Sequence, residues 1–173
     1  MVEKEVNSLS SQIRYCYATN KRSPRPVYLS VTSLAPGPTR AILEKVDGFP
    51  EGWVGRGFEL HTESMEEVHD KSKLVYLTSD SPNVLDDMDN DKIYVIGGIV
   101  DRNRLKRATI DRANVLGIAT AKLPIQKHLE LFTTKVLTCN HVFDIMLKYR
   151  ECGKDWKKAM LQVLPERKDV KGK

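Results

Sequence analysis

Short apolar runs alternate with polar stretches rich in glycine and proline along most of this chain. Three runs have the length and composition of β-strands, at Pro26–Val31, Lys73–Ser79 and Lys92–Val100. The third is almost continuously apolar, which is typical of a strand buried on both faces of a parallel sheet. Further short strands are predicted at Ile118–Pro124 and in the strand-like KVLT of Lys135–Thr138.

Helices are predicted between several of these strands. Short helices are expected at Arg40–Val46 and at about Pro82–Met88, the second capped by Asp80 or Ser81. A longer one is expected at about Thr109–Leu116 and ends at Gly117, as helices often do. Alternating strands and helices predict an α/β fold with a mainly parallel sheet flanked by helices.

Two amphipathic helices are predicted near the C-terminus. The first starts at Asn140 and carries Val142, Phe143, Met146 and Tyr149 at helical spacing. The second is capped by Asp155, and its apolar side consists of Trp156, Ala159, Met160 and Val163. Upstream, the stretch Asp47–Gly57 has loop composition, with Trp53 and Phe58 as expected packing anchors.

The size and composition narrow the class of protein. A chain of 173 residues, 40% hydrophobic and 29% charged, predicts a single globular domain. We find no apolar run near the roughly 20 residues that span a bilayer, and no signal-peptide core in MVEKEVNSLS. Three widely spaced cysteines favour a reducing compartment. We therefore expect an intracellular protein of the cytoplasm, the nucleus or both.

Charge is unevenly distributed, although the net charge is only +5. The segment Asp47–Lys92 has twelve acidic and four basic residues, whereas Lys148–Lys173 has nine basic and four acidic. Bases also outnumber acids five to two in Asp101–Arg112, and no acid lies between Ile13 and Pro26. Such separation indicates a polyanion-binding face, with a solvated surface and a basic tail as the alternative.

The most unusual segment is YVIGGIVDRNR, from Tyr94 to Arg104. Gly97 and Gly98 come late in the strand, where missing side chains allow close approach of a ligand or of other backbone. Asp101 follows directly; the alternative reading is a glycine bulge with an aspartate that caps a turn. The segment lacks a dinucleotide fingerprint. The sequence as a whole gives poor support for three other kinds of site: a nucleophilic cysteine or serine, a pair of glycosidase carboxylates, and a metal site built from histidine and cysteine.

Five segments in order resemble the tRNA N1-purine methyltransferases that act at nucleotide nine, of the SPOUT superfamily. They are LVYLTSDSPNVL, DKIYVIGGIVDRNR, AKLPI, KVLTCNHVFDIMLKY and DWKKAMLQVLPERK, and LSSQIRYCYATNKR matches more loosely. The resemblance implies a C-terminal trefoil knot at about residues 92–150, within one catalytic domain of residues 1–168 followed by a basic tail, 169–173. It also implies a monomer, either a naturally short family member or an excised catalytic domain.

The resemblance further implies a bent S-adenosylmethionine in a pocket formed by the knot loops, and no metal. By position, the residues expected at the cofactor lie at strand-to-loop junctions: Leu77, Thr78, Gly98, Arg102, Asn103, Arg104, Leu105, Lys106, Leu123, Pro124, Val136, Leu137 and Thr138.

Methylation of N1 of guanosine in tRNA is the expected reaction. Neutral guanine carries a proton on N1, and Asp101 is the only ionisable acceptor in its segment, so it is the candidate general base. Adenine N1 has no such proton, and the sequence leaves that substrate open. The cations expected on tRNA are Arg14, Lys21, Arg22, Arg104, Lys106, Arg107, Lys154, Lys157 and Lys158. The competing function is a non-catalytic, knotted tRNA-binding module.

Overall fold

The structure, a computed structural model, describes residues 2–55, 57–98, 107–129 and 137–164. Its elements, in chain order, are α1 (Glu3–Arg22), β1 (Leu29–Val31), α2 (Pro38–Leu43), β2 (Phe58–Leu60), α3 (Met65–Val68), η1 (Lys71–Lys73), β3 (Leu74–Leu77), β4 (Ile93–Ile96), α4 (Ala108–Leu116), β5 (Ala119–Ala121), α5 (Ile125–His128), α6 (Cys139–Glu151) and α7 (Trp156–Val163).

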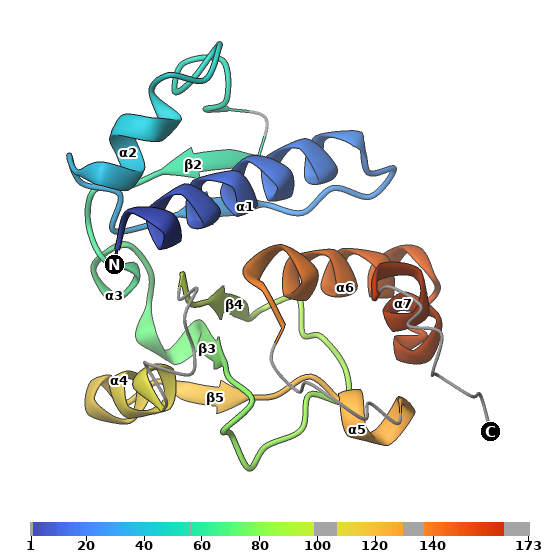
Figure 1. The fold of residues 1–173 in the computed structure, drawn as a ribbon. Coiled ribbons are helices and arrows are strands. Elements are labelled where there is room, and N and C mark those ends of the chain that lie inside the picture. Colours follow the sequence, from blue (N-terminus) through green and yellow to red (C-terminus); the bar gives the residue numbers. More distant parts are fainter. Residues whose placement is uncertain (1, 56, 99–106, 130–136, 165–173) are drawn as a thin grey trace.

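Two parallel sheets form the centre of the molecule. Strands β4, β3 and β5 pair in that order, and β1 pairs with β2. Figure 1 shows α1 lying along the β1–β2 sheet and above α6, while α4 packs at the other end of the molecule beside β5. The prediction of a mainly parallel α/β fold with flanking helices is therefore confirmed.

The long N-terminal helix α1 was not among the helices that the hydrophobic pattern predicted. Its buried side chains Val6, Leu9 and Cys16 nevertheless recur at steps of three or seven residues, and Ile13 fills the gap between them. This spacing places one apolar stripe along the helix. The stripe is narrow and is interrupted by polar residues, which is why the helix has only a weak signal in the sequence.

The prediction of an acidic helix at Pro82–Met88 is wrong. The chain there is extended, because the backbone N–H of Leu85 donates to Lys122 and that of Lys122 donates to Asn83. Ser81 is buried and accepts from the N–H of Asn83, so it closes a turn instead of capping a helix. Long-range pairing beside β5 thus overrides the local helix signal.

The strand predicted at Lys92–Val100 is shorter and less buried than expected. Strand β4 covers Ile93–Ile96, and all four of its residues are only half-buried. The reason is its place at the edge of its three-stranded sheet, where one side has no strand partner among the described residues. Residues 99 and 100 lie outside the described part of the chain.

Other local predictions are confirmed. Gly117 ends α4 in the left-handed conformation (φ 69°), and the Asp155 carboxylate caps α7 by accepting from the N–H of Lys158. Trp53 and Phe58 are buried anchors, and the Trp53 ring stacks on Tyr17 of α1 with a centroid separation of 4.0 Å. The apolar faces of α6 and α7 pack together in the largest core cluster.

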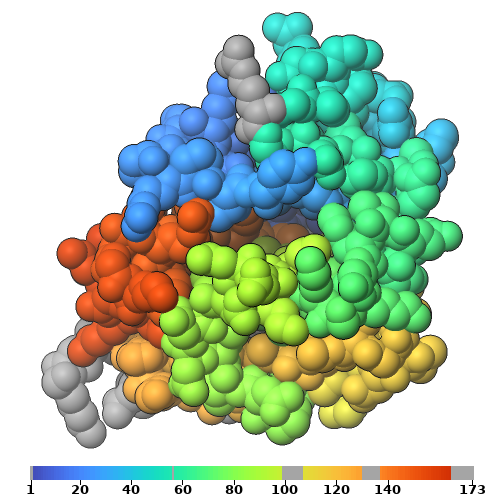
Figure 2. All heavy atoms as spheres, turned by 180° about the vertical axis from the view of Figure 1, so that it is seen from behind, coloured from blue at the N-terminus to red at the C-terminus, as the bar shows by residue number. Residues whose placement is uncertain are grey.

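A broad hollow of about 1150 Å³ separates the two sheets. Figure 2 shows it between the N-terminal segment in blue, the α6 region in orange and the yellow-green chain around β4. Within the described residues, no helix is long and apolar enough to cross a membrane.

Candidate functional site

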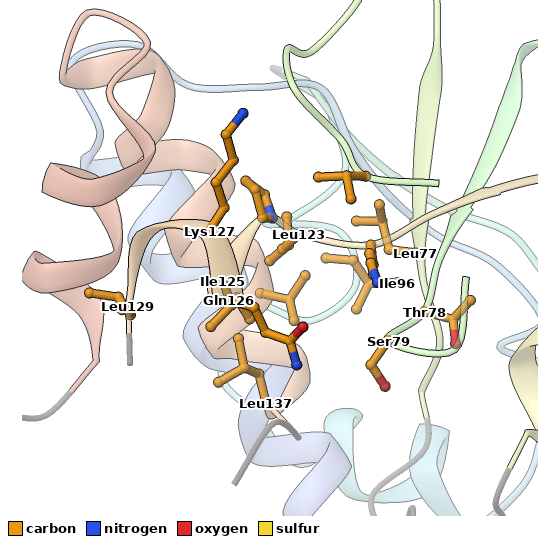
Figure 3. A pocket seen from close by; sticks show the side chains of 14 residues that line it. Leu77, Thr78, Ser79, Ile96, Leu123, Ile125, Gln126, Lys127, Leu129 and Leu137 are labelled. Carbon is orange, nitrogen blue, oxygen red and sulfur yellow. The ribbon is translucent and has the colours of Figure 1, made fainter. Parts of the chain in front are cut away.

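A second, smaller cavity of about 290 Å³ lies where β3, β5 and the start of α6 meet. Its walls come from four separate stretches of the chain, shown in Figure 3. The lining residues are Leu77, Thr78, Ser79, Val84, Ile96, Lys122, Leu123, Pro124, Ile125, Gln126, Lys127, Leu129, Leu137 and Val142.

Strand register brings these stretches together. Leu77 pairs with Ile96 of β4 on one side and with Ala121 of β5 on the other. The pairing continues one step further, since the N–H of Thr78 donates to the carbonyl of Ala121 at 2.9 Å. Three parallel strands thus end at the same edge, and the chain leaving each one borders the cavity.

The cavity is mainly apolar. Figure 3 shows the side chains of Leu77, Leu123 and Ile125 in its middle, with the hydroxyl-bearing Thr78 and Ser79 along one side. Lys127 also borders it, and its Nζ lies 3.5 Å from the carboxylate of Asp86 in an exposed pair that contributes little. Apolar walls with a few polar groups are typical of a site for a flat heterocycle with a polar extension.

Five of the predicted cofactor residues line this one cavity: Leu77, Thr78, Leu123, Pro124 and Leu137. They are separated by up to 60 positions in the sequence, so the fold gathers them. Thr138 is exposed directly after Leu137, where it is the N-cap residue of α6.

Gly98 lies elsewhere, on the lining of the broad hollow. A Cβ added to it would lie 3.4 Å from the side chain of Leu9 in α1. That distance is an ordinary van der Waals contact, so the packing of α1 does not by itself require glycine at this position.

Several predicted site residues lie outside the described residues. These are the candidate base Asp101 and, among the cofactor and tRNA positions, Arg102, Asn103, Arg104, Leu105, Lys106 and Val136.

The described cations predicted to hold tRNA are all exposed. Arg14, Lys21 and Arg22 belong to α1, whereas Lys154 lies between α6 and α7, and Lys157 and Lys158 belong to α7. Helix α6 packs on both α1 and α7. Lys154 is in addition paired with Asp87 at 3.0 Å. Arg107 stands apart from both groups, directly before α4.

Reciprocal contacts hold the end of α1 against the end of α6. The Arg25 guanidinium donates to the carbonyl of Arg150, and the Arg150 guanidinium donates to the carbonyl of Arg25. The Ser23 hydroxyl donates to Glu151 at 2.5 Å. The basic ends of the two helices therefore lie on the same side of the molecule.

The sequence did not reveal the role of Gln12. Its side-chain carbonyl accepts from the backbone N–H of Cys139, which follows the cavity residue Leu137 by two positions. The stripe of α1 residues at helical spacing was the available signal, but it gives no partner for a polar residue on that helix.

Cysteine chemistry has no support in the described structure. Burial raises the pKa of the Cys16 thiol to about 12, with further contributions from neighbouring Cys139 and Asp144. A thiol with that pKa stays protonated at neutral pH and is a poor nucleophile. All three cysteines are free, and the described residues contain no group of three or more side chains that could hold a metal ion.

Comparison with known proteins gives a consistent result. The family model for tRNA (guanine(9)-N(1))-methyltransferase TRM10/TRM10A matches residues 1–169. The chain is 43% identical over 169 residues to tRNA methyltransferase 10 homolog A of Rattus norvegicus, covering 97% of this chain and 49% of the relative. It is 40% identical over 176 residues to a tRNA (guanine(9)-N1)-methyltransferase of Schizosaccharomyces pombe, covering 98% and 56%. The chain thus spans about half the length of the curated relatives it matches.

Solved structures agree. A crystal structure of spTrm10(74) superposes with a TM-score of 0.86 at 39% identity, covering 95% of this chain and 88% of the other. A full-length spTrm10–SAH complex gives 0.85 at the same identity and coverage. These matches confirm the SPOUT-type fold class. A Trm10 structure from Thermococcus kodakaraensis, at 19% identity and a TM-score of 0.70, supports the fold alone.

Proposed function

This chain belongs to the tRNA (guanine(9)-N(1))-methyltransferase family TRM10/TRM10A, and on that premise we propose that it methylates N1 of guanosine at position 9 of tRNA. S-adenosylmethionine is the proposed methyl donor. The observation that carries the proposal is the convergence of Leu77, Thr78, Leu123, Pro124 and Leu137 on one apolar cavity at the carboxyl ends of parallel strands.

The small cavity suits the proposed donor. The volume of the cavity, about 290 Å³, is at the lower end of the range for small-molecule sites, which suits a bent, compact ligand. Apolar side chains can enclose the adenine, and the hydroxyls of Thr78 and Ser79, which border the same cavity, can fix its polar edge. A relative of 39% identity has been crystallised with SAH, the demethylated form of this donor.

Of the remaining predicted cofactor residues, Val136 and Thr138 flank Leu137 in the sequence, and residues 102–106 form part of the segment after β4. We retain them in the proposed site. Gly98 stays in it as well, although it lines the broad hollow and not the small cavity.

When bound, S-adenosylmethionine supplies an electrophilic methyl group. The chain must hold guanine N1 in line with that group and remove the N1 proton, so that a lone pair becomes available for attack. Asp101 is the proposed base for this proton, and general-base assistance is worth about 10² to 10⁴ in rate. Adenosine, whose N1 carries no proton, would depend less on Asp101.

The proposed tRNA contacts are electrostatic. RNA helices expose backbone and shape more readily than base edges, so cations on phosphates supply most of the affinity. The proposed inner contacts are Arg104, Lys106 and Arg107, and the proposed outer ones are Arg14, Lys21, Arg22, Lys154, Lys157 and Lys158. They must offset the cost of turning the buried purine outward, a few kcal/mol. As part of the same proposal, the chain is a monomer, and residues from about 92 to 150 form a knot.

Transfer of labelled methyl groups to unmodified tRNA tests the function. We expect incorporation into a transcript with G9 and none when position 9 is a pyrimidine; a transcript with A9 measures purine preference. A chain that binds SAH and tRNA but transfers no methyl would instead be the non-catalytic tRNA-binding module.

A further inference from the structure

Two consecutive residues of α5, Gln126 and Lys127, border different ends of the small cavity, and we propose that they fix the direction in which the methyl donor lies there. In this assignment the amide of Gln126 hydrogen-bonds the adenine, and the ammonium of Lys127 binds the carboxylate of the amino-acid end. The inference rests on the proposed function, because it assigns contacts to the proposed donor, S-adenosylmethionine. Neither residue is among the cofactor residues that the sequence predicts.

Helix α5 is a single turn that is held against the core. Ile125 and Leu129 both pack on the largest core cluster, and the N–H of Leu129 donates to the carbonyl of Ile125 at 2.8 Å. Successive residues of a helix differ in direction by about 100°, so the side chains of Gln126 and Lys127 diverge from this fixed turn. Figure 3 shows the result: the ammonium of Lys127 lies toward one end of the cavity and the amide of Gln126 toward the other.

The side chains that line the end at Gln126 are polar but uncharged. The amide of Gln126 is exposed and makes no hydrogen bond to a described residue, so its carbonyl and its amino group are both available. The hydroxyl of Ser79 lies toward the same end. Thr78 also lines the cavity and is only 8% exposed; its hydroxyl accepts from the N–H of Asp80 at 3.3 Å, and no described residue accepts from it in turn. This end therefore offers neutral donors and acceptors to a ligand.

The end at Lys127 carries charges of both signs. The Nζ of Lys127 lies 3.5 Å from the carboxylate of Asp86, and both side chains are exposed. The indole N–H of Trp156 donates to the backbone carbonyl of Asp86 at 2.8 Å, which fixes that residue beside α5. An ammonium next to a carboxylate is complementary to the α-carboxylate and α-ammonium of an amino acid.

The chemistry of the donor decides between the two directions. Adenine has an amino group beside ring nitrogens that accept, a pattern that a glutamine amide matches with two hydrogen bonds. The amino-acid end consists of one group that only accepts and one that only donates, and both are charged, so opposite charges bind them best. The reverse direction would place these charges against uncharged side chains and the adenine edge against an ion pair. Gln126 is therefore the proposed specificity residue for the nucleobase.

The test compares two ligands, because 5′-methylthioadenosine has the nucleoside of SAH but lacks its amino-acid end. Gln126→Met keeps the side-chain length and removes the hydrogen bonds, so it should weaken the binding of both ligands about fivefold. Lys127→Met should weaken the binding of SAH about threefold and leave 5′-methylthioadenosine unchanged, because that ligand has no carboxylate. Competition calorimetry at low salt measures all four affinities and needs no tRNA.

Gln162→Met is the matched control, since it makes the same exchange at an exposed residue of α7 that does not line the cavity. It should bind both ligands as the wild type does. Unchanged affinities in Gln126→Met would overturn the proposal, as would a loss in Gln126→Met that is confined to SAH or an equal loss of both ligands in Lys127→Met. A wild type that binds SAH but transfers no methyl to tRNA would refute the proposed function, and the binding pattern would still decide the direction of the ligand.

Discussion

The side-chain carbonyl of Gln12, in the middle of α1, accepts a hydrogen bond from the backbone N–H of Cys139, the first residue of α6, at 2.9 Å. The two residues are 127 positions apart. Gln12 therefore satisfies a donor at the helix start that has no intrahelical partner, and it fixes α1 relative to the chain that leaves the small cavity at Leu137.

Gln12→Ala should lower the free energy of unfolding by about 1 kcal/mol, because one amide donor loses its acceptor. Gln12→Glu is the matched control: it keeps an acceptor and places negative charge at a helix N-terminus, so most of the stability should remain. Urea unfolding of the three proteins measures both effects. Equal losses in the two variants would show that the contact to Cys139 contributes nothing.

Leu123→Trp should abolish binding of SAH, because the larger ring fills the cavity of about 290 Å³. Leu161→Trp makes the same change on α7 at a residue that is 52% exposed and does not line the cavity, and it should bind normally. Calorimetry in EDTA measures both and also tests the prediction that binding needs no metal. Normal affinity in Leu123→Trp would place the cofactor elsewhere.

Gly98→Val should destabilise the protein by about 1–3 kcal/mol, since its methyl groups extend beyond a Cβ that already lies 3.4 Å from Leu9 of α1. Leu9→Ala in the same chain should recover part of this loss by making room, a coupling that a thermal double-mutant cycle measures. Gly98→Ala should stay folded and bind SAH more weakly, because its Cβ makes only ordinary van der Waals contact with Leu9 but enters the proposed cofactor site. Normal SAH binding in a stable Gly98→Ala protein would remove Gly98 from that site.

Asp101→Asn should lower the rate of guanosine methylation by about 10² to 10⁴ and leave SAH affinity unchanged, because the amide cannot accept the N1 proton. Single-turnover assays with excess enzyme isolate the chemical step. Near-normal turnover would show that Asp101 only positions the substrate and that the proton leaves to water.

Lys157→Ala should weaken tRNA binding at low salt and reduce the slope of log affinity against log salt by about 1, the effect of losing one phosphate contact. Lys45→Ala is the matched control: it removes an exposed lysine beyond α2, far from the proposed contacts in the sequence. Both are measured at several salt concentrations. A slope near zero for the wild type would contradict electrostatic tRNA binding altogether.

Local signals in the sequence determined much of this protein. Gly117 ends α4 and Asp155 caps α7 because these features depend on residues within one turn. The burial of Val142, Phe143, Met146 and Tyr149 in α6 follows from their 3.6-residue spacing in the same way. The five ordered motifs predicted the family, which the comparisons then confirmed.

Tertiary structure alone decided the rest, because it depends on contacts between distant residues. Pairing of Val84 with Lys122 made the predicted helix at Pro82–Met88 an extended segment. Strand register, which no local pattern encodes, brought Leu77, Leu123 and Leu137 to one cavity. The hydrogen bond from the Cys139 backbone N–H to the Gln12 side chain likewise depends on how α1 and α6 pack. Hydrophobic periodicity determines which face of an element is buried, but only the packed chain determines what that face meets.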